Sequence, residues 1–134
     1  MSLFVWGENF NINVKEVDKQ HEKLVEILNN LYESMLAAKS NEILEKVLTE
    51  LINYTVEHFN TEEVLMDKYN YSGKEKHKDS HNKLKDKVGS YFNDFKNNKI
   101  NRTELLFFLK DWLYNHILDE DHLLGKFLNE KGVF

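Results

Sequence analysis

The chain has 134 residues, of which 41% are hydrophobic and 31% charged, as expected of one globular domain with its own core. Its 18 basic and 23 acidic residues are interspersed and leave a net charge of −5, so no surface for nucleic acid is predicted. It contains no cysteine, which excludes disulfides, thiolate chemistry and iron–sulfur clusters.

The first residues contain neither a basic region nor a long apolar one, so no signal peptide is expected. The longest purely apolar run, Leu105 to Leu109, is too short to cross a membrane. We therefore expect a monomeric, soluble, cytoplasmic protein without a membrane partner.

The chain contains no proline, which favours long uninterrupted helices. Residues 1–17 are predicted to form an extended arm. Asp18 is a good N-cap for a first helix over residues 18–38. A second helix begins at Ser40 or Asn41 and covers residues 41–69, with Ile43, Val47 and Leu51 on its inward stripe.

Ser72 and Glu75 form a capping box for a third helix over residues 73–97. Gly89 within it is interpreted as the mark of a close contact between helices. Asn101 and Glu104 form a similar pair at the start of a fourth helix over residues 102–121. A short last helix, Leu123 to Leu128, is expected to fold back. These elements predict an all-α, up-down-up-down four-helix bundle.

Five of the six histidines lie on the inward stripes of these helices. In an up-down bundle all five lie at one end, because they are early in the odd helices and late in the even ones. They are His21, His58, His77, His81 and His116. Glu62 follows His58 by four residues and shares its helical face. Burying so many polar groups is costly unless something coordinates them, so the pattern predicts a metal site.

The ligand types indicate which metal the site would hold. Five imidazoles and a carboxylate are too many for one zinc ion, which takes four ligands. A nitrogen-rich set without sulfur suits a pair of iron ions. The Glu-x-x-His pairs of ferritin-like proteins are absent; only Asp18–His21 and Asp119–His122 come near that spacing. His-Glu-x-x-His is absent too, so a zinc protease is unsupported.

Four segments together resemble the hemerythrin family across essentially the whole chain. They are Val17-Asp-Lys-Gln-His21, His58-Phe-Asn-Thr-Glu-Glu63, His77-Lys-Asp-Ser-His81 and Trp112-Leu-Tyr-Asn-His-Ile-Leu-Asp-Glu-Asp121. The resemblance implies a single domain over residues 1–134 with a non-heme di-iron centre. One iron would be held by His77, His81 and His116, and the other by His21 and His58. Glu62, Asp121 and an oxo or hydroxo group from solvent would bridge the two ions.

Periodicity and resemblance disagree over the second carboxylate. Spacing alone favours Glu120, four residues after His116, whereas the family motif selects Asp121. A local π-bulge would reconcile them. His122 matches no motif and is predicted to lie on the surface.

Apolar residues beside the ligands are interpreted as core that also forms a dry pocket around the open iron position. They are Leu24, Phe59, Trp112 and Leu113. The resemblance places Leu113 against bound O2.

The resemblance implies reversible O2 binding, for delivery, storage or sensing, and no enzymatic activity. O2 is the expected ligand, and a redox or delivery partner is conceivable. A di-iron redox enzyme, such as a peroxidase or a nitric-oxide-handling protein, is the first alternative. An iron-storage bundle is the second.

Overall fold

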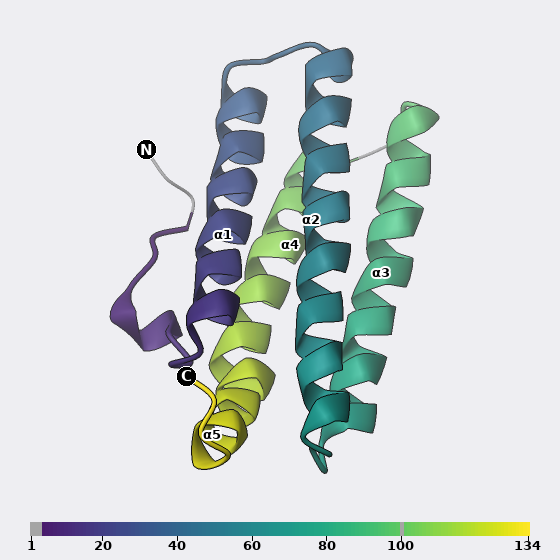
Figure 1. Cartoon of the computed structure of the whole chain (residues 1–134). Helices are drawn as coiled ribbons and strands as arrows, with labels where there is room; N and C mark the ends of the chain where they lie inside the picture. Colours follow the sequence, from purple (N-terminus) through teal and green to yellow (C-terminus); the bar gives the residue numbers. More distant parts are fainter. Residues whose placement is uncertain (1–3, 100) are drawn as a thin grey trace.

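Four long helices run alternately up and down and lie side by side (Figure 1). The computed structural model describes residues 4–99 and 101–134, so the first three residues of the predicted arm lie outside it. The helices are α1 (Lys15–Leu36), α2 (Asn41–Lys68), α3 (Lys74–Lys96) and α4 (Arg102–His116). A π-helical segment, η2 (Ile117–Asp121), leads into a short α5 (His122–Glu130). The predicted all-α four-helix bundle with a short C-terminal helix is confirmed.

None of the helices in the described part of the chain is long and apolar enough to cross a membrane.

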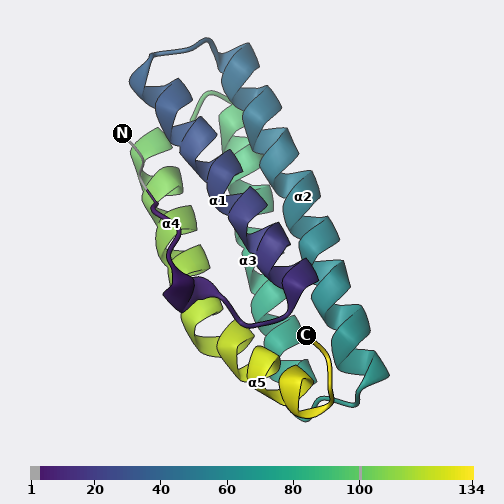
Figure 2. The same cartoon turned by 60° about the vertical axis from the view of Figure 1, so that its left-hand side comes forward.

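The N-terminal arm packs against α1 and α4 and is less extended than predicted, since it contains a 3-10 turn, η1 (Glu8–Phe10) (Figure 2). The backbone N–H of Phe4 donates to the Asn29 side chain at 3.0 Å, and the Asn29 amide donates back to the Phe4 carbonyl at 2.8 Å. The Phe10 ring meets the Tyr114 ring of α4 edge-on at 5.5 Å. The arm therefore ties α1 to α4.

The start predicted for the first helix is wrong by three residues. The helix α1 begins at Lys15, after Val14, and no side chain caps it. Asp18 lies inside the first turn, where an acidic residue is also favourable. Its carboxylate accepts a hydrogen bond from the Ile12 backbone N–H at 2.7 Å. Asp18 thus holds the arm against the helix.

Two of the predicted helix caps form, at Ser40 and Asn101, and two do not, at Asp18 and Ser72. The Ser40 hydroxyl accepts from the Ile43 N–H at 3.4 Å, and the Asn101 side chain accepts from the Glu104 N–H at 3.0 Å. The capping box at Ser72 is wrong, because α3 begins at Lys74 after Gly73 and has no side-chain cap.

At the start of α2 the inward stripe lies one position later than predicted, whereas Leu51 is buried as predicted. Leu44 and Leu48 are each 1% exposed, whereas Ile43 is 44% exposed. Apolar residues occupy adjacent positions along this half of α2, so periodicity alone allows either stripe.

The interpretation of Gly89 is also wrong. A Cβ atom added there would meet nothing within 4 Å, so the glycine borders open space and not a close helix contact. Gly125 on α5 is the closely packed glycine. A Cβ at that position would lie 2.6 Å from the carbonyl oxygen of Ile12, which lets α5 approach the arm.

Candidate metal centre

The seven predicted ligand residues come together at the end of the bundle where α2 turns into α3. Each is at most 6% exposed. One comes from α1, two from α2, two from α3, one from the end of α4 and one from η2: His21, His58, Glu62, His77, His81, His116 and Asp121.

Their donor atoms form two groups, within each of which all atoms lie within 4.8 Å of one another. The larger group contains three histidines and both carboxylates: His77, His81, His116, Glu62 and Asp121. The smaller contains two histidines and the same two carboxylates: His21, His58, Glu62 and Asp121. Glu62 and Asp121 therefore belong to both groups, as bridging ligands would.

Three neighbouring residues contact the outer nitrogens of three of the five imidazoles. His58 Nδ1 lies 2.8 Å from the Gln20 amide oxygen, and His81 Nδ1 lies 3.1 Å from a Glu63 carboxylate oxygen. These oxygens only accept, so each Nδ1 carries the proton. The lone pair of each neutral ring is then on Nε2, which faces the cluster. Such outer partners orient metal ligands and make them more basic.

Each of these outer partners lies on the helix that precedes, along the chain, the helix of its histidine. Gln20 on α1 contacts a histidine of α2, and Glu63 on α2 contacts a histidine of α3. Ser80 on α3 lies 3.4 Å from His116 Nδ1 on α4. No role was predicted for these residues from the sequence. Each is the immediate neighbour of a ligand in sequence, which is the one signal that could have identified them.

Several buried polar atoms in the cluster lack a hydrogen-bond partner. They include both nitrogens of His21, His77 Nε2, and both carboxylate oxygens of Glu62 and of Asp121. Some lie close together, such as His21 Nε2 and Asp121 Oδ2 at 2.9 Å, but without the geometry of a hydrogen bond. Donor atoms of these residues lie within 4.8 Å of one another in each group, as in a coordination site, and unpartnered buried polar atoms are otherwise rare.

The Nε2 nitrogens of His81 and His116 are also close enough to share a bound ion. Their Nε2 atoms lie 3.2 Å apart. Because His81 carries its proton on Nδ1, its Nε2 lone pair faces His116 Nε2, where either an N–H of His116 or a cation between the two rings satisfies it. The donor set therefore fits a metal ion.

The electrostatics of the cluster also favour positive charge. Burial opposes ionisation of Glu62 and Asp121, yet the surrounding histidines outweigh it and lower the pKa of both carboxyl groups below their ordinary values. Burial opposes protonation of His77, but the adjacent carboxylates of Asp121 and Glu62 outweigh it and raise the pKa of His77 to about 10. Two buried carboxylates thus remain ionised, and protons or metal ions compete to neutralise them.

The π-helical segment determines that Asp121, and not Glu120, faces the cluster. Its wider turn brings residue i+5 back over residue i. As a result Asp121 Oδ1 lies 3.1 Å from His116 Nε2, on the cluster side of the ring. Glu120 lies behind the ring, 3.5 Å from His116 Nδ1.

His122 is less exposed than the surface position predicted for it. It is half-buried, and its Nδ1–H donates to the Ile117 carbonyl at 2.7 Å. It belongs to neither group of donor atoms and helps to close the π-helical turn.

The four predicted pocket residues line one apolar cavity of about 390 Å³. They are Leu24, Phe59, Trp112 and Leu113. Phe59 stacks on the His81 ring at 3.7 Å, and Trp112 stacks on the His116 ring at 4.3 Å. The two aromatic rings therefore pack on two imidazoles of the three-histidine group and also line the cavity.

Comparison with known proteins agrees with this geometry. The sequence model described as "Hemerythrin HHE cation binding domain" matches residues 13–128. Bacteriohemerythrin from Methylococcus capsulatus is 33% identical over 131 residues, which cover 96% of this chain and 99% of the relative. Bacteriohemerythrin from Pseudomonas aeruginosa is 32% identical over 90% of this chain and 78% of the relative.

Solved structures give the same result. A crystal structure of wild-type hemerythrin superimposes with a TM-score of 0.86 at 32% identity, over 93% of this chain and 97% of that one. A leucine-to-alanine variant of hemerythrin gives 0.87 over 94% and 97%. With the domain match, the shared bundle and the buried cluster of histidines and carboxylates, the chain belongs to the hemerythrin family.

Proposed function

We propose that this chain holds two iron ions between its four helices and binds O2 reversibly. The observation that carries the proposal is the pair of donor groups that share Glu62 and Asp121. A bound pair of ferrous ions would supply the two electrons that such binding requires.

The protein's own residues support this assignment in two ways. The larger group offers five residues and the smaller four, so the His21 and His58 side has room for one more ligand. Leu24 and Leu113 add apolar side chains to the cavity wall next to that part of the bundle, which opposes the entry of water. A site with a free position and dry surroundings favours binding over release of a reduced oxygen product.

The test begins with iron analysis of protein expressed with ample iron. We expect about two irons per chain, as two donor groups require. His58→Gln should reduce the iron content, whereas Glu57→Gln, an exposed control next to it on α2 and outside both groups, should not. One zinc ion and no iron would contradict the proposal.

O2 binding is then tested by mixing the reduced, iron-loaded protein with O2 in a stopped-flow spectrometer. We expect a visible absorption band that is stable for minutes and disappears when O2 is removed. Rapid decay with turnover of a peroxide substrate would indicate a redox enzyme instead. Tight iron binding without any O2-dependent band would indicate iron storage.

A further inference from the structure

The apolar cavity is larger than O2 binding needs. An apolar cavity of about 150 Å³ stays dry and holds a benzene molecule, so one of about 390 Å³ has room for roughly ten to fifteen carbon atoms. It is lined by residues of all four long helices. This size lies within the range of pockets for organic ligands.

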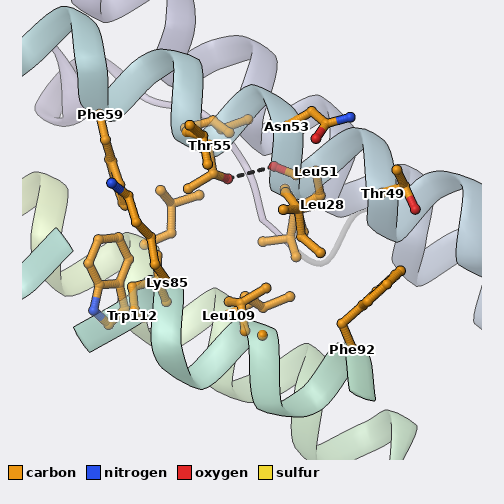
Figure 3. A pocket seen from close by; sticks show the side chains of 17 residues that line it. Leu28, Thr49, Leu51, Asn53, Thr55, Phe59, Lys85, Phe92, Leu109 and Trp112 are labelled. Carbon is orange, nitrogen blue, oxygen red and sulfur yellow. Dashed lines mark hydrogen bonds between the residues drawn. The ribbon is translucent and has the colours of Figure 1, made fainter. Parts of the chain in front are cut away.

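The shape of the cavity fits a chain rather than a ring system. Figure 3 shows Phe59 and Trp112 at one end and Thr49 and Phe92 at the other. Thr49 and Phe59 are ten residues apart on α2, which is roughly 15 Å of helix. A cavity of that length and volume is about as wide as one unbranched alkyl chain.

The walls of the cavity contain few polar groups that would disfavour an apolar tail. The Thr55 hydroxyl donates to the Leu51 carbonyl at 2.6 Å, and the Thr49 hydroxyl donates to the Glu45 carbonyl at 2.8 Å. Both hydroxyl hydrogens are therefore used within α2. The remaining polar lining residues, Asn53 and Lys85, are solvent-exposed.

Exposed lining residues mark the mouth of the cavity between α2 and α3. Val56 on α2 is 47% exposed, and the lining residues Lys85 and Gly89 on α3 are exposed as well. Gly89 leaves open space there, because a Cβ atom would meet nothing within 4 Å. The absent side chain keeps the mouth wide.

Lys85 is the one charged residue among the described residues that line the cavity. Its Nζ lies 5.9 Å from the centre of the Phe59 ring, and within the described chain no carboxylate lies within ion-pair distance of it. An anionic group at the mouth would meet a cation and no lining carboxylate.

We propose that this cavity binds an amphipathic monocarboxylate, with its unbranched apolar tail along the bundle and its carboxylate at Lys85. Such a ligand has the chemistry of a medium-chain fatty acid. The Phe59 and Trp112 rings lie between the cavity and the His81 and His116 imidazoles, so the tail does not need to contact these two imidazoles. Leu24 and Leu113 line this cavity as well as the proposed O2 pocket, so the binding test does not use O2 as its readout.

The test is calorimetric titration of the iron-loaded protein with decanoate, and with 1-decanol as the uncharged counterpart. We expect saturable binding at one site. Gly89→Leu should weaken both ligands at least about tenfold, because its side chain fills the mouth. Gly89→Ala, the matched control, should change either affinity by less than about threefold.

Lys85→Gln separates recognition of the carboxylate from recognition of the tail. It should weaken decanoate about two- to fivefold, as expected for an exposed ion pair, and leave 1-decanol unchanged. Unchanged iron content would verify that each variant is folded. Absence of saturable binding, or binding that Gly89→Leu leaves intact, would overturn the proposal. An unaltered decanoate affinity in Lys85→Gln would overturn the role of the carboxylate.

Discussion

Leu113 lies three residues before His116 and lines the cavity beside the metal cluster. Residues at this spacing share a helical face, so its side chain projects toward the same end of the bundle as the imidazole. Truncation would open space next to polar groups, and water enters such a space because it finds hydrogen-bond partners there.

We therefore expect Leu113→Ala to fold, with a loss of about 2 kcal/mol because the side chain is only half-buried, and to retain two irons. The O2-dependent absorption band should decay to the oxidised state several times faster than in the parent protein. The measurement is band decay at fixed pH.

Leu109→Ala is the matched control for this prediction. Leu109 lines the same cavity one helical turn farther from His116. It should destabilise the fold without accelerating the decay. Equal decay rates in Leu113→Ala and the parent would show that Leu113 is only a core residue.

At the scale of elements, the π-helical segment decides which carboxylate faces the cluster. Asp121 is buried within both donor groups, whereas Glu120 contacts only the outer nitrogen of His116. Asp121→Ala should therefore lose iron and the absorption bands of the bridged pair. Glu120→Ala should retain two irons. Elemental analysis and visible spectra of both variants test this, and the reverse result would mean that the segment presents Glu120.

At the scale of the whole molecule, metal removal should expose a pH dependence of stability. The pKa of His77 is raised from 6.5 to about 10, so its stabilising contribution is complete below pH 6.5 and is lost as the pH rises through about 10. The pKa values of Glu62 and Asp121 are lowered from 4.5 and 3.8, so their contribution is lost as the pH falls below that range.

The free energy of unfolding of the metal-free protein should therefore be highest between about pH 4.5 and 6.5. Thermal unfolding of chelator-treated protein across this range and up to pH 10.5 is the measurement. Iron loading should stabilise the protein more as the pH rises, because protons compete with the metal for the same nitrogens. His77→Gln should flatten the alkaline decline, and an unchanged slope would contradict the assignment.

The sequence alone determined the number of long helices and the end of the bundle at which the histidines meet. Both follow from short-range regularities. A spacing of four residues puts His77 and His81 on one helical face. Because successive helices run in opposite directions, these two residues lie at the same end of the bundle as His21 and His116. The caps at Ser40 and Asn101 were equally local, because each side chain bonds a backbone group three residues away.

The tertiary structure alone decided matters that depend on a neighbouring helix. Periodicity defines a helical face only to within about one residue, so packing selected Leu44 over Ile43. The backbone had to widen into a π-turn before Asp121 could reach the cluster. Gln20, Glu63 and Ser80 bond histidines of the next helix. Likewise, Gly89 borders a cavity only because the surrounding side chains leave space there, and no local pattern records a gap between helices.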